Sequence, residues 1–82
     1  MNSITVLRCL AGDPGATLAP AAMLLLAQVA RIQRRVPLPP EILDDAVQEG
    51  LLAALQGRRP ASAFSAEIRR QLRARVGGEA DR

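Results

Sequence analysis

Several carboxylates occur close together in one short stretch of the sequence. They are the first candidates for functional side chains. Residues 41–49 carry four acidic side chains and no basic one. Such groups serve general acid–base catalysis, ligate hard cations or contact basic partners. Catalysis needs a water-poor pocket and Ca²⁺ prefers a ligand loop, whereas this stretch has the pattern of an exposed helix. We therefore expect a docking surface for a basic partner; the alternative is a solvated first turn favoured by the helix dipole. The candidate contact residues are Glu41, Asp44, Asp45, Gln48 and Glu49.

Composition narrows the function classes further. The chain has 82 residues, of which 49% are hydrophobic, and it contains no His, Trp or Tyr and one Phe. Most side chains used for general base catalysis, metal ligation and base stacking are missing, so we expect a protein that is not an enzyme and needs no metal or cofactor. The single cysteine, Cys9, lies among apolar residues, which predicts a buried thiol in a reducing compartment.

The apolar run over residues 21–30 is the one candidate for a membrane or targeting segment. It is about half of the ~20 residues that a membrane span requires. A signal peptide would also need a basic region before it, and Arg8 is the only charged residue ahead of Asp13. We therefore expect a cytoplasmic protein with no membrane partner.

Hydrophobic spacing predicts one all-α domain over residues 1–78, a small bundle of three main helices and a short N-terminal one, followed by a disordered tail over residues 79–82. The expected helices cover residues 4–11, 20–36 and 40–56, and a last helix from Ser62 or Ser65 to the glycines at 77 and 78. The apolar residues expected to face the core are Ile4 and Leu7; Ala22, Leu25, Val29, Ile32 and Val36; Leu43, Val47, Leu51, Ala54 and Leu55; and Phe64, Ile68, Leu72 and Val76.

Positive charge is concentrated in the second half of the chain. All eleven basic residues are Arg, and residues 58–75 carry six of them against the single acidic Glu67. The small net charge of +3 therefore results from segments of opposite sign, acidic over residues 41–49 and basic over residues 58–75. The arginines either contact phosphates, with salt-sensitive and sequence-independent affinity, or form a solvated face. The candidate nucleic-acid-binding residues are Arg58, Arg59, Arg69, Arg70, Arg73 and Arg75.

The stretch DDAVQEG, residues 44–50, resembles the second conserved region of bacterial RNA polymerase sigma factors. In that family a helix with a D-x-V-Q-E-G pattern docks on the clamp coiled coil of the largest polymerase subunit. The matching positions are Asp45, Val47, Gln48, Glu49 and Gly50. Upstream, LRCLAGDPGATL resembles the first helix and turn of the extracytoplasmic-function members. Downstream, Phe64, Ser65, Leu72 and Arg73 match the F-S-x-x-A-x-x-x-I-R helix of the larger ones. The resemblance covers roughly residues 4–76.

The departures from the family pattern concern promoter recognition. The segment between Gly50 and Phe64 is shorter than in the housekeeping members. Where those carry aromatic residues that capture flipped bases, this sequence has Glu67, Arg70 and Gln71, and the promoter-reading remainder of the helix is absent. Base capture needs an aromatic platform, so we expect no promoter opening by this protein alone.

The resemblance implies a truncated sigma region two and a small sigma-like transcription regulator that binds RNA polymerase core through the acidic helix. The Arg-rich helix would contact nucleic acid or a second, companion protein, in a phage, mobile-element or gene-transfer setting. The main alternative is a protein-interaction module, anti-activator or antitoxin-like, that binds one regulatory partner. A stand-alone helix-turn-helix DNA binder is disfavoured because the last helix lacks Asn, Lys and Ser after Ser65.

Overall fold

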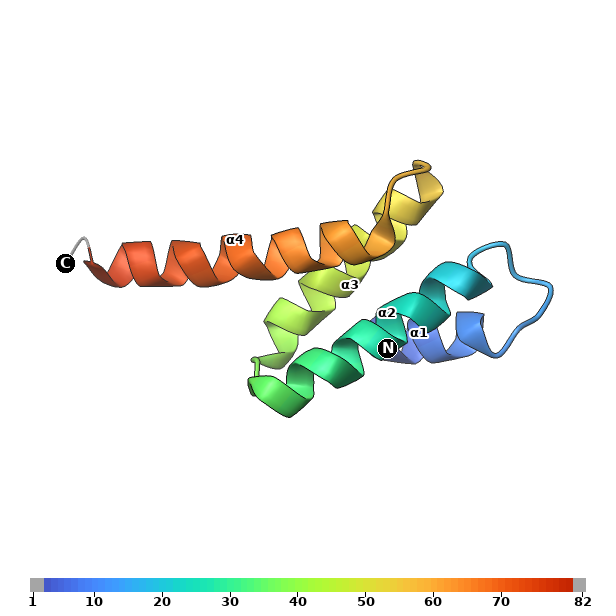
Figure 1. Cartoon of the computed structure of the whole chain (residues 1–82), viewed down its shortest axis with the longest axis horizontal. Helices are drawn as coiled ribbons and strands as arrows, with labels where there is room; N and C mark the ends of the chain where they lie inside the picture. The colour runs from blue at the N-terminus through green and yellow to red at the C-terminus, as the bar shows by residue number, and fades with distance from the viewer. Residues whose placement is uncertain (1–2, 81–82) are drawn as a thin grey trace.

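Four helices make up the described part of the chain, which confirms the all-α class. The structure, a computed structural model, describes the backbone of residues 3–80 and the side chains of residues 3–75. The helices are α1 (Ser3–Ala11), α2 (Ala19–Arg35), α3 (Pro40–Leu55) and α4 (Pro60–Ala80). α1 packs mainly on α2 and α3 mainly on α4, and the two pairs cross (Figure 1). The second half of α4 extends past α3, so the molecule is elongated, 50 × 25 × 22 Å.

The short first helix forms as predicted, but its cysteine does not point inward. Leu7 is fully buried, with Ile4 and Leu10 partly buried on the same side. Cys9 is exposed, so the expectation of a buried thiol was wrong. Cys9 follows Leu7 by two residues, about 200° around the helix, and a helix packed on one side leaves that position to solvent.

Prolines set the boundary between α2 and α3. Val36 adopts an extended conformation at the end of α2, as expected for a residue that precedes proline, and its N–H still donates to the Ile32 carbonyl at 2.9 Å. Pro40 is the first residue of α3, where its fixed φ is favourable and its missing N–H costs nothing. Both boundaries agree with the prediction to within one residue.

The buried face of α3 differs in phase from the predicted stripe. Leu43 and Val47 are buried as expected, but Ala54 is only partly buried and Leu55 is 68% exposed, so the last turn was assigned wrongly. The buried residues of α3 are Ile42, Leu43, Ala46, Val47, Gly50 and Ala53. Val36, the last residue of the stripe predicted on α2, is also exposed. Leu55 and Val36 both lie at helix ends, where no neighbouring helix covers them. Apolar periodicity does not show where the cover by a neighbouring helix stops.

Gly57 ends α3 as predicted, in a left-handed conformation with φ of 74°. The Arg58 N–H donates to the Ala53 carbonyl at 2.8 Å and the Gly57 N–H to the Ala54 carbonyl at 3.2 Å. These two bonds form a Schellman motif, which satisfies the last carbonyls of the helix. The chain then reverses within four residues and enters α4.

Both ends of α4 differ from the prediction. The helix begins at Pro60, two residues before Ser62, because proline is favourable in a first turn. It continues through Gly77 and Gly78 to Ala80; each glycine costs about 1 kcal/mol of helix propensity but keeps its N–H for the helical hydrogen bond. Of the tail predicted over residues 79–82, the first two residues are helical. Residues 81 and 82 lie outside the described part, as does the side chain of Val76.

The core lies where the two helix pairs cross. Phe64 is 1% exposed and Ile68 is 3% exposed, so the apolar stripe of α4 is core over these two positions, while Leu72 is exposed. The core residues contributed by the four helices are Leu7, Ala22, Leu25, Val29, Ile42, Leu43, Ala46, Val47, Phe64 and Ile68.

Gly50 lies at the tightest point of this core. A Cβ built on it would lie 2.6 Å from Cδ2 of the fully buried Leu25 and 3.3 Å from the Pro60 carbonyl oxygen. The glycine of the DDAVQEG stretch thus permits close approach of three helices. Any side chain there displaces either Leu25 or the first turn of α4.

We predict that Gly50→Ala destabilises the protein by about 1 kcal/mol, because overpacking a core typically costs about 1–3 kcal/mol and alanine regains about 1 kcal/mol of helix propensity. Urea unfolding followed by circular dichroism measures the change. Gly15→Ala is the control, since its Cβ would meet only the Asp13 side chain at an ordinary 3.5 Å. A Gly50→Ala protein as stable as the Gly15→Ala protein would contradict the packing argument.

Candidate functional site

The solvent face of α3 changes character halfway along the helix. Glu41, Asp45 and Gln48 are exposed and recur at steps of three and four residues. The same face continues at Leu52, which is 44% exposed, and Leu55. The helix therefore presents one continuous stripe, acidic in its first half and aliphatic in its second. The leucines that follow the acidic stretch belong to this outer surface as well as to the core.

Asp44 has a structural role that the sequence did not reveal. Its Oδ1 accepts a hydrogen bond of 2.7 Å from the Ser3 N–H at the start of α1. Gln48 Nε2 donates to Asp44 Oδ2 at 3.0 Å and to the Ser3 hydroxyl at 3.4 Å. The carboxylate thus caps the N-terminus of another helix, where a negative charge is favourable. Hydrogen bonding by the Ser3 side chain and then by its N–H, with a smaller effect from Gln48, lowers the pKa of Asp44.

Asp45 belongs to a second network, which joins α3 to α4. Gln71 Nε2 donates to Asp45 Oδ2 at 2.9 Å and to Glu67 Oε2 at 2.8 Å. The Arg70 guanidinium also pairs with Glu67, with Nε 2.9 Å from Oε1. Hydrogen bonds from Arg70 and then Gln71 lower the pKa of Glu67. The hydrogen bond to Glu67, with smaller contributions from the charges of Glu49 and Asp45, raises the pKa of Arg70.

These networks divide the predicted acidic site. Glu41 and Asp45 are exposed, whereas Asp44 and Glu49 are half-buried. Gln48 is exposed, but its amide nitrogen is already occupied by α1 and Asp44. Two of the four carboxylates are therefore exposed, and one of these, Asp45, also accepts the Gln71 hydrogen bond.

The predicted basic site is also divided. Arg70 faces α3 and its guanidinium is engaged by Glu67. Arg58 is exposed, and its Nε donates to Gln56 Oε1 at 2.9 Å at the turn after α3. The remaining predicted arginines, Arg59, Arg69, Arg73 and Arg75, are exposed. Arg70 is therefore the one arginine of this set whose guanidinium is paired with a carboxylate among the described residues.

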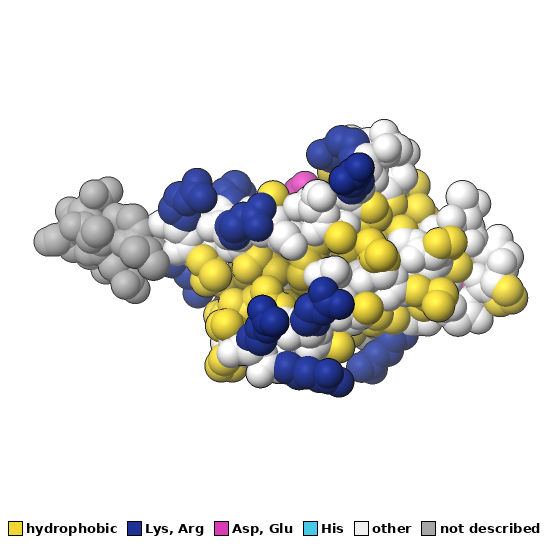
Figure 2. Space-filling view, viewed as in Figure 1, with side chains coloured by type: hydrophobic (Ala, Val, Ile, Leu, Met, Phe, Trp, Pro, Cys, Tyr) yellow, Lys and Arg dark blue, Asp and Glu magenta, His cyan; other side chains and the backbone are white. Residues whose placement is uncertain are grey.

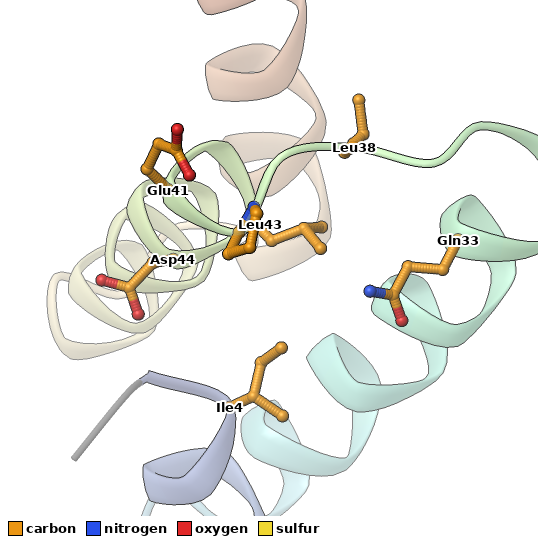
Figure 3. A pocket seen from close by; sticks show the side chains of 7 residues that line it. Ile4, Gln33, Leu38, Glu41, Leu43 and Asp44 are labelled. Carbon is orange, nitrogen blue, oxygen red and sulfur yellow. The ribbon is translucent and has the colours of Figure 1, made fainter.

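A pocket of about 530 Å³ opens beside the acidic face and was not predicted from the sequence. Figure 3 shows Ile4 of α1, Gln33 of α2 and Leu43 of α3 around a common space, with the carboxyl groups of Glu41 and Asp44 turned away from its centre. Leu38 and Pro40 complete the lining. Its walls are largely aliphatic, so its chemistry suits an apolar side chain. The pocket exists only because α1, α2 and the start of α3 come together in the tertiary structure, and no spacing in the sequence signals it.

Among the described residues, no group of three or more Cys, Asp or Glu side chains is placed to hold a metal ion. No helix in this part of the chain combines the length and hydropathy of a membrane span.

No family model matches the chain, and no curated protein or solved structure is significantly similar to it. The resemblance to sigma factors therefore stays a prediction from the sequence motifs.

The cap that Asp44 provides predicts a pH-dependent stability. Because folding lowers the pKa of Asp44 below its ordinary value of 3.8, its contribution is present above that value and is lost as the pH falls toward the folded-state pKa. Asp44→Asn should be less stable than the parent at about pH 7, and the difference should narrow at about pH 3. Urea unfolding at the two pH values measures it.

Glu41→Gln is the matched control, since this carboxylate lies on the same helix and is exposed. It should leave stability nearly unchanged at both pH values. An equal loss of stability in the two variants at neutral pH would show that general helix-dipole effects, and not the cap on α1, account for the result.

Proposed function

We propose that this protein is a small sigma-like transcription regulator that binds RNA polymerase core through the exposed stripe of α3. The observation that carries the proposal is the position of Asp45 and Gln48. These residues of the D-x-V-Q-E-G match lie on the solvent face, while the Val47 and Gly50 of the same match are buried. The buried residues of the motif pack in the core, and its exposed residues form an accessible polar surface. A docking helix requires both.

The chemistry of the stripe fits a basic helical partner such as the clamp coiled coil. Glu41 and Asp45 supply charges for guanidinium and ammonium groups, which favours rapid association. Leu52 and Leu55 extend the surface with exposed aliphatic area that a partner would bury. The pocket beside Glu41 would receive an apolar side chain of the same partner.

A second candidate function is a protein-interaction module, anti-activator or antitoxin-like, that binds one regulatory partner. The exposure of Leu55, at 68%, favours it, since a leucine pair at the end of a helix suits many protein partners. The two functions differ in whether polymerase core is captured.

The proposal predicts that immobilised protein captures purified core polymerase and that Asp45→Arg weakens capture about tenfold or more, because like charges would then face each other across the contact. Quantitative pull-down over a range of core concentrations, in moderate salt, measures the loss. Circular dichroism checks that the variant keeps its helicity, since Asp45 also accepts the Gln71 hydrogen bond.

Asp13→Arg is the matched control: it makes the same change of charge at an exposed residue of the loop between α1 and α2. It should capture core polymerase as the parent does. Equal loss in both variants would indicate a response to net charge alone, and no capture by the parent would overturn the polymerase proposal in favour of the interaction module.

A further inference from the structure

A groove of about 160 Å³ between α2 and α4 brings arginines of α2 beside the basic helix. Arg31 and Arg35 line it from α2, together with Gln28, and Ser65 lines it from α4. Neither arginine belongs to the basic patch predicted over residues 58–75. The sequence places them about thirty residues away from α4, and only the crossing of the two helices brings them to its side.

Helical spacing places further arginines next to the groove lining on both helices. On α2, Arg35 follows Arg31 by four residues, so both side chains lie on one face. On α4, Arg69 and Arg73 follow Ser65 at steps of four and are exposed. Successive residues advance about 100° around a helix, so Arg34, three residues after Arg31, lies about 60° from it around α2. This displacement is away from the lining residues of that helix.

Figure 2 shows how arginine side chains are distributed over one face of the molecule. Dark blue arginine side chains lie over α4 and over α2, with a band of hydrophobic and white surface between them, and almost no acidic side chain appears on this face. The sequence of α2 contains no Asp or Glu. Among the described residues, the one ion pair of an arginine with a carboxylate is that of Arg70 with Glu67. The cations beside the groove are therefore uncompensated.

The lining of the groove indicates what kind of anion it fits. Its apolar lining is Ile32 and Phe64, and because Phe64 is 1% exposed, the aromatic ring offers almost no area for a partner to bury. Gln28 and Ser65 supply neutral hydrogen-bonding groups in the same lining as the guanidinium groups of Arg31 and Arg35. Phosphate contacts in nucleic-acid complexes come from this combination of side chains, and arginine pairs with phosphate in a bidentate manner.

We propose that the groove between α2 and α4 binds the phosphate backbone of duplex nucleic acid, with Arg31 and Arg35 as contact residues alongside Arg69 and Arg73. Binding is independent of base sequence, because contacts to phosphates carry no base-sequence information. A duplex is preferred over a single strand because its charge density is higher and the one aromatic ring of the lining, Phe64, is buried and cannot stack on free bases. Arg70 takes no part, since Glu67 holds its guanidinium on the other side of α4.

This inference goes beyond the polymerase contact, and its test contains no polymerase, so the two can fail separately. The experiment is fluorescence anisotropy of a labelled mixed-sequence DNA duplex titrated with the full chain at several salt concentrations. The parent should bind, with an affinity that falls steeply as salt rises. Arg31→Gln combined with Arg35→Gln should reduce the slope of log affinity against log salt by about two, one for each lost phosphate contact.

Arg8→Gln combined with Arg34→Gln is the matched control, because it removes the same charge from two exposed arginines that do not line the groove. It should keep nearly the parental slope. Equal slopes in the two double variants, or no binding by the parent, would overturn the proposal.

Competition with polyglutamate and with single-stranded DNA at equal charge completes the test. Displacement by polyglutamate as effective as by duplex would assign the groove to an acidic protein, and a preference for the single strand would contradict the duplex assignment.

Discussion

The close approach of α2, α3 and the start of α4 at Gly50 is the contact on which the rest of this small structure depends. A Cβ at this position would meet the buried Leu25 side chain and the Pro60 carbonyl, so glycine lets the three helices pack at this distance without displacing either group. The crossing fixes the burial of Phe64 and Val47. It also sets which face of α3 points to solvent and brings α4 beside α2. Both candidate surfaces lie on helices that meet at this contact.

The acidic stretch combines a structural role with an exposed one. Asp44 caps α1 through the Ser3 N–H and holds Gln48, so part of the negative charge stabilises the fold. Asp45 takes the Gln71 hydrogen bond while its side chain remains exposed, and Glu41 is exposed without serving α1. A set of carboxylates that looks uniform in the sequence is thus divided between holding the bundle together and forming its outer surface. This division explains why so many acids occur in nine residues.

The positive charge is divided in the same way. Arg70 forms an ion pair with Glu67, and the charges of Asp45 and Glu49 also raise the pKa of Arg70. One side of α4 therefore interacts electrostatically with the acidic residues of α3. Arg69 follows Ser65 by four residues on α4, and Ser65 lines the same groove as Arg31 and Arg35. The last helix therefore separates two surfaces of opposite character. A protein of this size has a high ratio of surface to volume, so each of its helices keeps a long exposed face. It can therefore present an acidic stripe and a basic groove at the same time.

The sequence by itself determined the helices, their junctions and the exposure of most charges. Apolar spacing, the prolines at 37 to 40 and the glycine at 57 act locally, so they are readable without the fold. The burial of Cys9 and Leu55 was predicted wrongly, because a side chain is covered only where another helix lies against it. The cap on α1 by Asp44, the need for glycine at position 50 and the meeting of Arg31 with Ser65 were decided by tertiary structure alone. Each joins residues far apart in the chain, and the crossing of helices that brings them together leaves no periodic signal in the sequence.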